Sequence, residues 1–204
     1  MNPTLSPDAA RDAPPGPGDA LLLVDVQHDF LPGGALAVPQ GDRVLAPLQR
    51  CLAAFARQGL PVFATRDWHP AAHCSFTAQG GPWPPHCVAG SAGAAFPQAL
   101  QWPPGATVVS KGTETGQEAY SGFAGTELAA QLKAAGVRRL FVGGLATDYC
   151  VKSTVLDARE HGFDVVVLRD AVAAVNVQPA DGEQALGAMA QAGAALRDSA
   201  QALG

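Results

Sequence analysis

The segment Leu21-Leu22-Leu23-Val24-Asp25 is an uninterrupted apolar run that ends on a carboxylate. A short apolar run without polar alternation is typical of a strand buried on both faces, as the strands of parallel sheets are. Apolar residues at helical spacing follow over 44–55, and further apolar runs alternate with helical patterns along the chain. Parallel strands connected by helices produce this alternation. The sequence therefore predicts an α/β fold: a single domain of three layers, α/β/α, around a mostly parallel central sheet.

At least five strands are expected in this sheet. After the first, the apolar runs lie at 61–64, 107–109, 140–142 and 165–168, and the helical patterns lie near 127–135, 147–161 and 182–192. The stretch 193–198 is only weakly apolar, so the sequence leaves a last edge strand open. The Pro- and Gly-rich stretch 70–105 is long for a loop, which usually signals function.

Length and composition narrow the class of protein. The chain has 204 residues, 48% hydrophobic and 15% charged, with a net charge of -5. An acidic chain without clustered Lys or Arg argues against nucleic acid or an anionic membrane as partner, and favours a small-molecule ligand. Four cysteines in a chain of this length suit a reduced compartment, so we expect a cytoplasmic protein. A homo-oligomer is left open.

The first 18 residues differ in composition from the rest. They are rich in Pro, Gly, Asp and Ala, and have neither the basic leader nor the apolar core of a signal peptide. We expect a flexible tail over 1–18 and the folded domain over 19–204.

Chemically active residues follow the apolar runs where each run stops. Asp25 ends the first run, Asp67 follows the second, Lys111 follows the third, and Cys150 lies shortly after the fourth. The carboxyl ends of parallel strands share one edge of the sheet, where ligands bind. We therefore expect these four residues to converge.

Cys150 has the surroundings of a nucleophile. Thr147 is a candidate N-cap, which would place the sulfur in the first turn of a helix, where a thiolate is favoured. Backbone N–H groups of the turn 143–146 and of Cys150 could hold an oxyanion. With Asp25 as proton acceptor and Lys111 as balancing charge, these residues suit acyl transfer. Taken singly, such a cysteine is more often a small buried hydrophobe than a nucleophile.

Three of the five histidines, His69, His73 and His86, fall within 18 residues, and Asp67 lies just upstream. Neutral imidazoles beside a carboxylate are typical ligands of a divalent cation. A closed structural zinc site that uses Cys74 and Cys87 is the alternative, although the Asp ligand and irregular spacing suit an open site better.

Five segments occur in order between about 20 and 194 and together carry a family resemblance: Asp25-Val26-Gln27-His28-Asp29-Phe30, Thr65-Arg66-Asp67-Trp68-His69, Trp83-Pro84-Pro85-His86-Cys87, Ala119-Tyr120-Ser121-Gly122-Phe123 and Ala146-Thr147-Asp148-Tyr149-Cys150. They resemble the nicotinamidases, a branch of the isochorismatase-like cysteine hydrolases. The Trp-Pro-Pro-His segment separates this branch from its metal-free relatives.

The resemblance implies a fold of the isochorismatase type and a role for each residue of the triad. Cys150 would be the nucleophile, Asp25 the general base and later acid, and Lys111 the residue that orients and charge-balances them. The N–H groups of Ala146 and Cys150 would form the oxyanion hole, next to a cis peptide at Leu145-Ala146. The implied reaction is hydrolysis of nicotinamide through a thioester to nicotinic acid and ammonia in NAD salvage. Activity on pyrazinamide and other pyridine carboxamides is left open.

The same resemblance assigns Asp67, His69 and His86 to one divalent metal ion, zinc first, with iron or manganese as alternatives. The pyridine nitrogen of the substrate would join its shell. The role of His73 is left open, because family members differ between a fourth ligand there and a contact from the position of Ser75 to a metal-bound water.

Aromatic residues at three positions match those that enclose the substrate ring in the family. They are Phe30, Trp83 and Tyr120. Without the family resemblance, these three residues could simply be aromatic residues of the hydrophobic core.

Two alternative functions remain open on the sequence. One is a sister amidohydrolase that acts on a carbamoyl or ureido substrate with the same triad and no metal. The presence of Asp67, His69 and His86 disfavours this alternative, because they are candidate metal ligands. The other is a non-enzymatic thiol sensor or zinc-stabilised binding module, in which Cys150 is oxidised and not acylated.

Overall fold

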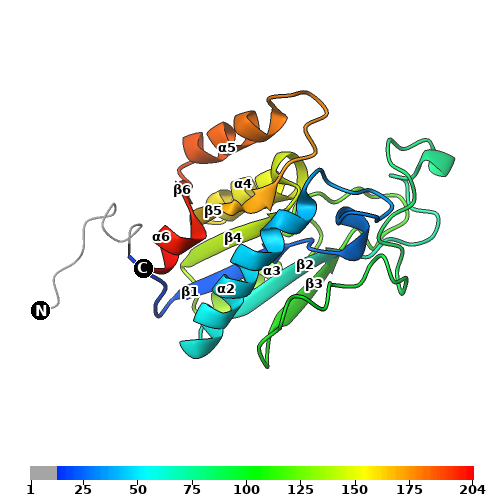
Figure 1. The fold of residues 1–204 in the computed structure, drawn as a ribbon. Coiled ribbons are helices and arrows are strands. Elements are labelled where there is room, and N and C mark those ends of the chain that lie inside the picture. The colour runs from blue at the N-terminus through cyan, green and yellow to red at the C-terminus, as the bar shows by residue number, and fades with distance from the viewer. Residues whose placement is uncertain (1–12) are drawn as a thin grey trace, which may run out of the picture.

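The computed structural model describes residues 13–204. Six parallel strands form one sheet in the order β3-β2-β1-β4-β5-β6 (Figure 1). Their bounds are β1 (Asp19–Val24), β2 (Val62–Asp67), β3 (Thr107–Lys111), β4 (Arg139–Leu145), β5 (Asp164–Ala173) and β6 (Ala195–Arg197). The predicted α/β class is confirmed, and the described strands are all parallel. The edge strand that the sequence left open is β6, which has only three residues.

Five α-helices and four short helical turns occur in the described residues, and all but the C-terminal α6 lie between strands. The helices are α2 (Leu45–Arg57), α3 (Leu128–Ala134), α4 (Lys152–Glu160), α5 (Asp181–Gln191) and α6 (Ser199–Leu203). The turns are η1 (His28–Phe30), η2 (Gly41–Val44), η3 (Thr77–Gln79) and η4 (Thr147–Val151). Within the described part of the chain, no helix combines the length and apolar content needed to cross a membrane.

The apolar run of β1 is continuous because both faces of this strand are covered. Leu21 and Leu23 pack in the core under α2 and α6, whereas Leu22 and Val24 pack in the core under α3, α4 and α5. Successive side chains of a strand point to opposite faces, so a central strand between two helical layers needs apolar residues at every position. All four side chains are fully buried.

The strand order places a topological switch in the middle of the sheet. The chain leaves β1 toward α2 on one face and leaves β4 toward α4 on the other. Neighbouring strands whose connections diverge in this way open a crevice at their carboxyl ends, which is where ligands bind in open α/β sheets. The crevice thus lies beside the ends of β1 and β4.

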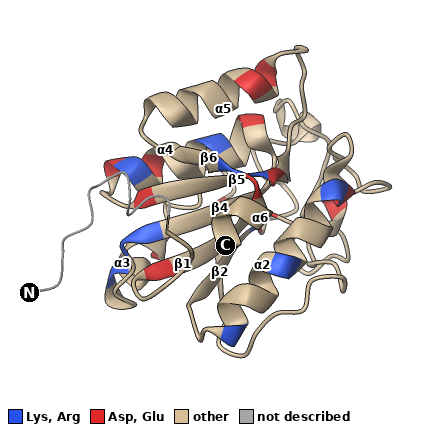
Figure 2. Cartoon of the chain, turned by 60° about the vertical axis from the view of Figure 1, so that its left-hand side comes forward, with Lys and Arg blue, Asp and Glu red and all other residues tan. Residues whose placement is uncertain are grey.

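Most charged residues lie at the surface, and buried Asp25, Asp67 and Lys111 are exceptions at the carboxyl ends of the strands. In Figure 2, basic and acidic side chains are scattered over separate helices and loops, and the central strands carry few of them. This distribution agrees with a chain whose charges mainly keep it hydrated.

The predicted N-terminal tail lies only partly in the structure. Residues 1–12 fall outside the described residues. The carbonyl groups of Ala13 and Pro14 accept hydrogen bonds from Arg139, which also pairs with Asp19 at 2.6 Å. The boundary at residue 18 stays a prediction.

Candidate active site

Four strand ends bring their residues together, as predicted. Asp25 directly follows β1, Asp67 is the last residue of β2, Lys111 is the last residue of β3, and Cys150 lies in η4 after β4. Asp67 and Lys111 are neighbours in the register of β2 and β3. The carboxylate oxygens of Asp25 and Asp67 and the sulfur of Cys150 lie within 4.8 Å of one another.

The ammonium of Lys111 is the centre of this cluster. Its Nζ donates to Asp67 Oδ1 at 2.5 Å, to the carbonyl oxygen of Ala119 at 3.0 Å and to Cys150 Sγ at 3.6 Å. Asp25 Oδ2 lies 2.9 Å from Nζ in an ion pair but is left without a hydrogen bond.

The second oxygen of Asp25 is held by a neighbouring strand. Thr65 Oγ1 in β2 donates to Asp25 Oδ1 at 2.6 Å, and the backbone of Asp25 is left-handed with φ 50°. Thr65 thus holds Oδ1 of this fully buried carboxylate, while Oδ2 faces Lys111, accepts no hydrogen bond among the described residues and can take a proton. This is the arrangement that a general base requires.

Electrostatics keep the cluster ready for proton transfer. Burial raises the pKa of Asp25, although Lys111 acts in the opposite direction. Burial also raises the pKa of the Cys150 thiol well above its ordinary value. For Lys111, burial lowers the pKa, but the carboxylates of Asp25 and Asp67 outweigh it and hold the pKa well above its usual range. The thiol is thus neutral at rest, and its reaction as a nucleophile needs a proton acceptor.

Cys150 lies in a π-helical turn that runs directly into α4. The turn begins one residue earlier than expected, since Ala146 and not Thr147 is the N-cap, and no side chain caps it. The peptide bond Leu145-Ala146 is cis, as the resemblance implied. Within residues 13–204, the N–H of Ala146 donates to no protein acceptor. This group is available to a ligand oxygen next to the sulfur.

Asp67, His69 and His86 form a second buried group, whose ligand atoms all lie within 4.8 Å of one another. His69 Nδ1 lies 2.9 Å from the carbonyl oxygen of Gly112, and His86 Nδ1 lies 2.8 Å from that of Pro84. A carbonyl accepts a hydrogen bond, so the proton of each ring belongs on Nδ1 and Nε2 offers its lone pair.

The electrostatics of this group suit a cation. Burial lowers the pKa of His86, which favours the neutral imidazole that a metal binds. Burial acts in the same direction on His69, but the Asp67 carboxylate outweighs it and raises the pKa, so positive charge at this ring is stabilised. One carboxylate and two imidazoles fit a divalent ion with open coordination positions. The alternative with Cys74 and Cys87 is not what this structure assembles, because neither cysteine joins the group among the described residues.

His73 does not belong to this group. Its Nδ1 lies 2.7 Å from Ser75 Oγ and its Nε2 lies 3.0 Å from the carbonyl oxygen of Gln117, so both ring nitrogens have partners. The ring stacks on His69, with centroids 4.1 Å apart. In this arrangement, His73 supports a neighbouring imidazole and offers no free lone pair.

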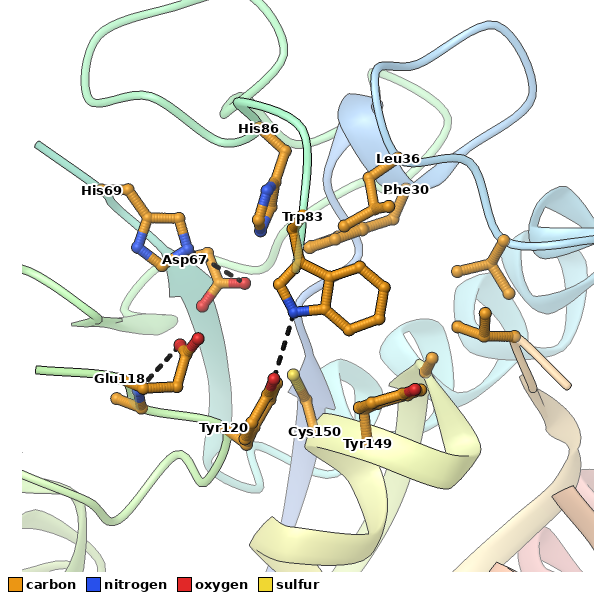
Figure 3. A pocket seen from close by; sticks show the side chains of 14 residues that line it. Phe30, Leu36, Asp67, His69, Trp83, His86, Glu118, Tyr120, Tyr149 and Cys150 are labelled. Carbon is orange, nitrogen blue, oxygen red and sulfur yellow. Dashed lines mark hydrogen bonds and ion pairs between the residues drawn. The ribbon is translucent and has the colours of Figure 1, made fainter. Parts of the chain in front are cut away.

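A pocket connects the two groups, and the three predicted aromatic residues line it (Figure 3). Trp83 Nε1 donates to the hydroxyl of Tyr120 at 3.1 Å, and Phe30 packs against His86 at a centroid distance of 5.7 Å. The sulfur of Cys150 points into the same space. A flat apolar ring with one polar group on either side would match these walls.

Sequence reasoning missed several residues of the site. Tyr149 lies edge-on to Trp83 at 5.3 Å, and its place beside Cys150 was a signal that could have found it. Thr65, which holds Asp25, stands in a quoted segment but has no distinctive spacing. The remaining missed pocket residues come from loops and gave no periodic signal: Leu36, Val38, Glu118, Ala119 and Val175.

Known proteins are similar to this chain in architecture and sequence. The Isochorismatase domain model matches residues 19–201. The nicotinamidase of Escherichia coli is 41% identical over 201 residues, which covers 88% of this chain and 94% of the relative. A crystal structure of the pyrazinamidase of Pyrococcus horikoshii in complex with zinc is 47% identical, with a TM-score of 0.85 over 89% of this chain and 99% of the other. PnC1 from L. infantum in complex with nicotinate is 40% identical, with a TM-score of 0.82 over 91% and 94%. The chain therefore belongs to the isochorismatase family and is a nicotinamidase-like amidohydrolase.

Proposed function

We propose that this protein hydrolyses nicotinamide to nicotinic acid and ammonia, and accepts pyrazinamide as a second substrate. One observation carries the proposal: Cys150, which contacts the buried Lys111 and Asp25, lines the same aromatic-walled pocket as Asp67, His69 and His86. A substrate with a carboxamide on one side of a ring and a basic nitrogen in the ring could reach both groups at once. Of the relatives named above, one is a nicotinamidase, one is a pyrazinamidase in complex with zinc, and PnC1 is in complex with nicotinate, the acid that this reaction would release.

In the first half-reaction, Asp25 accepts the thiol proton of Cys150 while the sulfur attacks the carboxamide carbon. The carbonyl oxygen becomes an oxyanion beside the N–H groups of Ala146 and Cys150. Collapse of this adduct breaks the carbon–nitrogen bond, and the nitrogen leaves as ammonia with the proton from Asp25. The acyl group remains on Cys150 as a thioester.

In the second half-reaction, Asp25 takes a proton from water, whose oxygen attacks the thioester carbon. The carbon–sulfur bond breaks, the acid leaves, and the proton returns to the sulfur. Lys111 is charged in the resting site, because the carboxylates of Asp25 and Asp67 hold its pKa high. Its role is to orient Cys150 and balance the charge of Asp25.

The metal ligands would be Asp67, His69 and His86, which lie on the pocket side opposite Tyr149 (Figure 3). A divalent ion held there, zinc or in its place iron or manganese, would supply a coordination position for the pyridine nitrogen. Phe30, Trp83 and Tyr120 would enclose the ring between that position and Cys150. Such positioning lowers the entropy cost of bringing the carbonyl carbon to the sulfur.

The test is ammonia release from purified protein with nicotinamide, before and after treatment with a strong chelator. We expect turnover that the chelator abolishes and that added zinc, iron or manganese restores. Pyrazinamide serves as a second substrate and a ureido acid as the competitor. If the protein hydrolyses only the ureido acid, and the chelator has no effect, the proposal is wrong and the protein is a metal-free sister amidohydrolase. Absence of any hydrolysis would favour a thiol or zinc module.

A further inference from the structure

The segment that follows β1 carries two buried or half-buried polar side chains that the reaction does not use. Gln27 and Asp29 alternate with Asp25 along this segment. Gln27 is fully buried, and Asp29 lies in the turn η1. Neither side chain belongs to the Asp67–His69–His86 group. Gln27 bonds to the backbone of Asp67, and Asp29 bonds to the backbone N–H of Cys87, next to His86.

The side chain of Gln27 forms two hydrogen bonds with the backbone of Asp67. Its Oε1 accepts from the Asp67 N–H at 2.8 Å, and its Nε2 donates to the Asp67 carbonyl at 2.8 Å. The same Nε2 donates to the carbonyl of Ala94 at 3.0 Å. A side-chain amide that satisfies both polar groups of one residue fixes that residue as a neighbouring strand would. The last residue of β2 is thereby held where its carboxylate faces the two imidazoles.

Asp29 performs a similar task for His86. Its Oδ2 accepts from the N–H of Cys87 at 2.7 Å, and this N–H belongs to the peptide unit between His86 and Cys87. Its Oδ1 accepts from the N–H of Ala35 at 3.2 Å, next to the pocket residue Leu36. One carboxylate thus ties the loop of a predicted metal ligand to the loop that forms an apolar wall.

The packing around Asp29 leaves no room for this carboxylate to move toward Gly93. The N–H of Asp29 donates to the carbonyl of Gly93 at 2.9 Å. A Cβ atom added at Gly93 would overlap the Asp29 carboxylate, although the backbone of Gly93 does not require glycine for its φ. Gly93 therefore leaves the space that the Asp29 carboxylate occupies, whose Oδ2 accepts from Cys87 and whose Oδ1 accepts from Ala35.

We propose that Gln27 and Asp29 are positioning residues that hold Asp67 and His86 in their ligand arrangement before any ion arrives. His86 lies in an irregular loop, and without such bonds, ordering it would consume part of the free energy of metal binding. The inference rests on the proposed function only in that Asp67, His69 and His86 are taken as the metal ligands.

The experiment measures the affinity of the chelator-stripped protein for Zn²⁺ and Co²⁺ by competition with a chromophoric chelator. We expect Gln27→Leu, Asp29→Ala and Gly93→Ala each to weaken binding by about tenfold or more, the lower end of the usual range for residues that support metal ligands. Asp29→Asn should fall between parent and Asp29→Ala, because one oxygen remains for the Cys87 N–H.

Matched controls separate positioning from general loss of hydrogen bonds or added volume. Asp181→Ala removes a carboxylate that accepts a backbone N–H at 2.7 Å in an exposed turn, and Gly116→Ala adds a Cβ that meets open space. Both should bind Zn²⁺ as the parent does. The visible spectrum of the Co²⁺ protein is the decisive readout, since its bands report ligand geometry: it should change for Asp29→Ala and Gly93→Ala and not for the controls.

Each outcome decides the matter. Parent-like affinity and spectra in all Gln27, Asp29 and Gly93 variants would overturn the positioning role while leaving the metal site intact. Equal weakening in the controls would also overturn it. A parent protein that binds neither ion would overturn the metal site of the proposed function and this inference together. Gly93→Ala, which removes no polar atom, keeps the test valid if Gln27→Leu does not fold.

Discussion

Replacement of Lys111 by Met tests how the buried charges of the site hold one another in place. The ammonium lies 2.9 Å from Asp25 and 2.5 Å from Asp67, and all three side chains are buried. At an effective dielectric constant of about 20, unit charges 2.9 Å apart attract by roughly 6 kcal/mol, and the cost of burying them offsets part of this. Met keeps most of the apolar stem and removes the charge.

Loss of one partner of a buried ion pair costs about 3–5 kcal/mol, because the remaining charge stays buried without compensation. We expect Lys111→Met to lower the free energy of unfolding by this amount at neutral pH, out of about 5–15 kcal/mol for a typical domain. The measurement is urea unfolding followed by tryptophan fluorescence, with a chelator present so that no ion replaces the missing charge.

The decrease in the free energy of unfolding caused by Lys111→Met should grow as pH rises. In the variant, burial without Lys111 raises the folded-state pKa of Asp25 and Asp67 above the unfolded value of about 4. Such groups stabilise the fold fully below the unfolded pKa and lose that contribution as pH rises through the folded pKa. In the parent, Asp67 has the opposite behaviour: burial raises its pKa, but Lys111 and His69 outweigh it and lower the pKa, so its contribution is lost as pH falls. The difference between parent and variant should therefore be largest near about pH 8 and shrink toward about pH 5.

Two further variants complete this test. Lys133→Met removes an exposed lysine of α3 and should leave stability unchanged. Asp25→Asn in the Lys111→Met background removes the opposite charge and should recover part of the loss. A cost below about 1 kcal/mol, or one that is the same at both pH values, would refute the idea that Lys111 compensates the two carboxylates.

Three other predictions concern activity. Cys150→Ala should stop ammonia release and leave the bound metal unchanged, as measured by metal analysis of the same sample; residual turnover would remove Cys150 as nucleophile. His86→Ala should lose metal and raise KM for nicotinamide, while iodoacetamide still alkylates Cys150; an unaltered metal content would remove His86 as a ligand. The acid limb of kcat/KM should lie above the ordinary carboxyl value of 3.8, because burial raises the pKa of Asp25, which must be ionised to accept the thiol proton; a limb at or below that value, with metal content constant over the range, would contradict Asp25 as the base.

The sequence alone was sufficient to predict the α/β fold and the convergence of Asp25, Asp67, Lys111 and Cys150. Continuous apolar runs mark strands buried on both faces, and parallel strands end at one edge, so a residue at the end of a run has a defined place in space. The grouping of Asp67, His69 and His86 was foreseen from residue types that bind cations and from the resemblance, although 17 positions separate the two histidines along the chain.

Only the tertiary structure decided how these residues are held. Several features have no signature in periodicity or spacing. They are the Oδ2 atom of Asp25, which accepts no hydrogen bond among the described residues, the occupied ring nitrogens of His73, the π-helical turn that contains Cys150, and the hydrogen bonds of Gln27 and Asp29. Periodicity records which face of an element is buried, because burial acts on every residue of the strand or helix. Loop side chains instead take hydrogen-bond partners from distant segments, as Gln27 does from Ala94, 67 residues away, and the path of the backbone brings those partners within reach only after the sheet has formed.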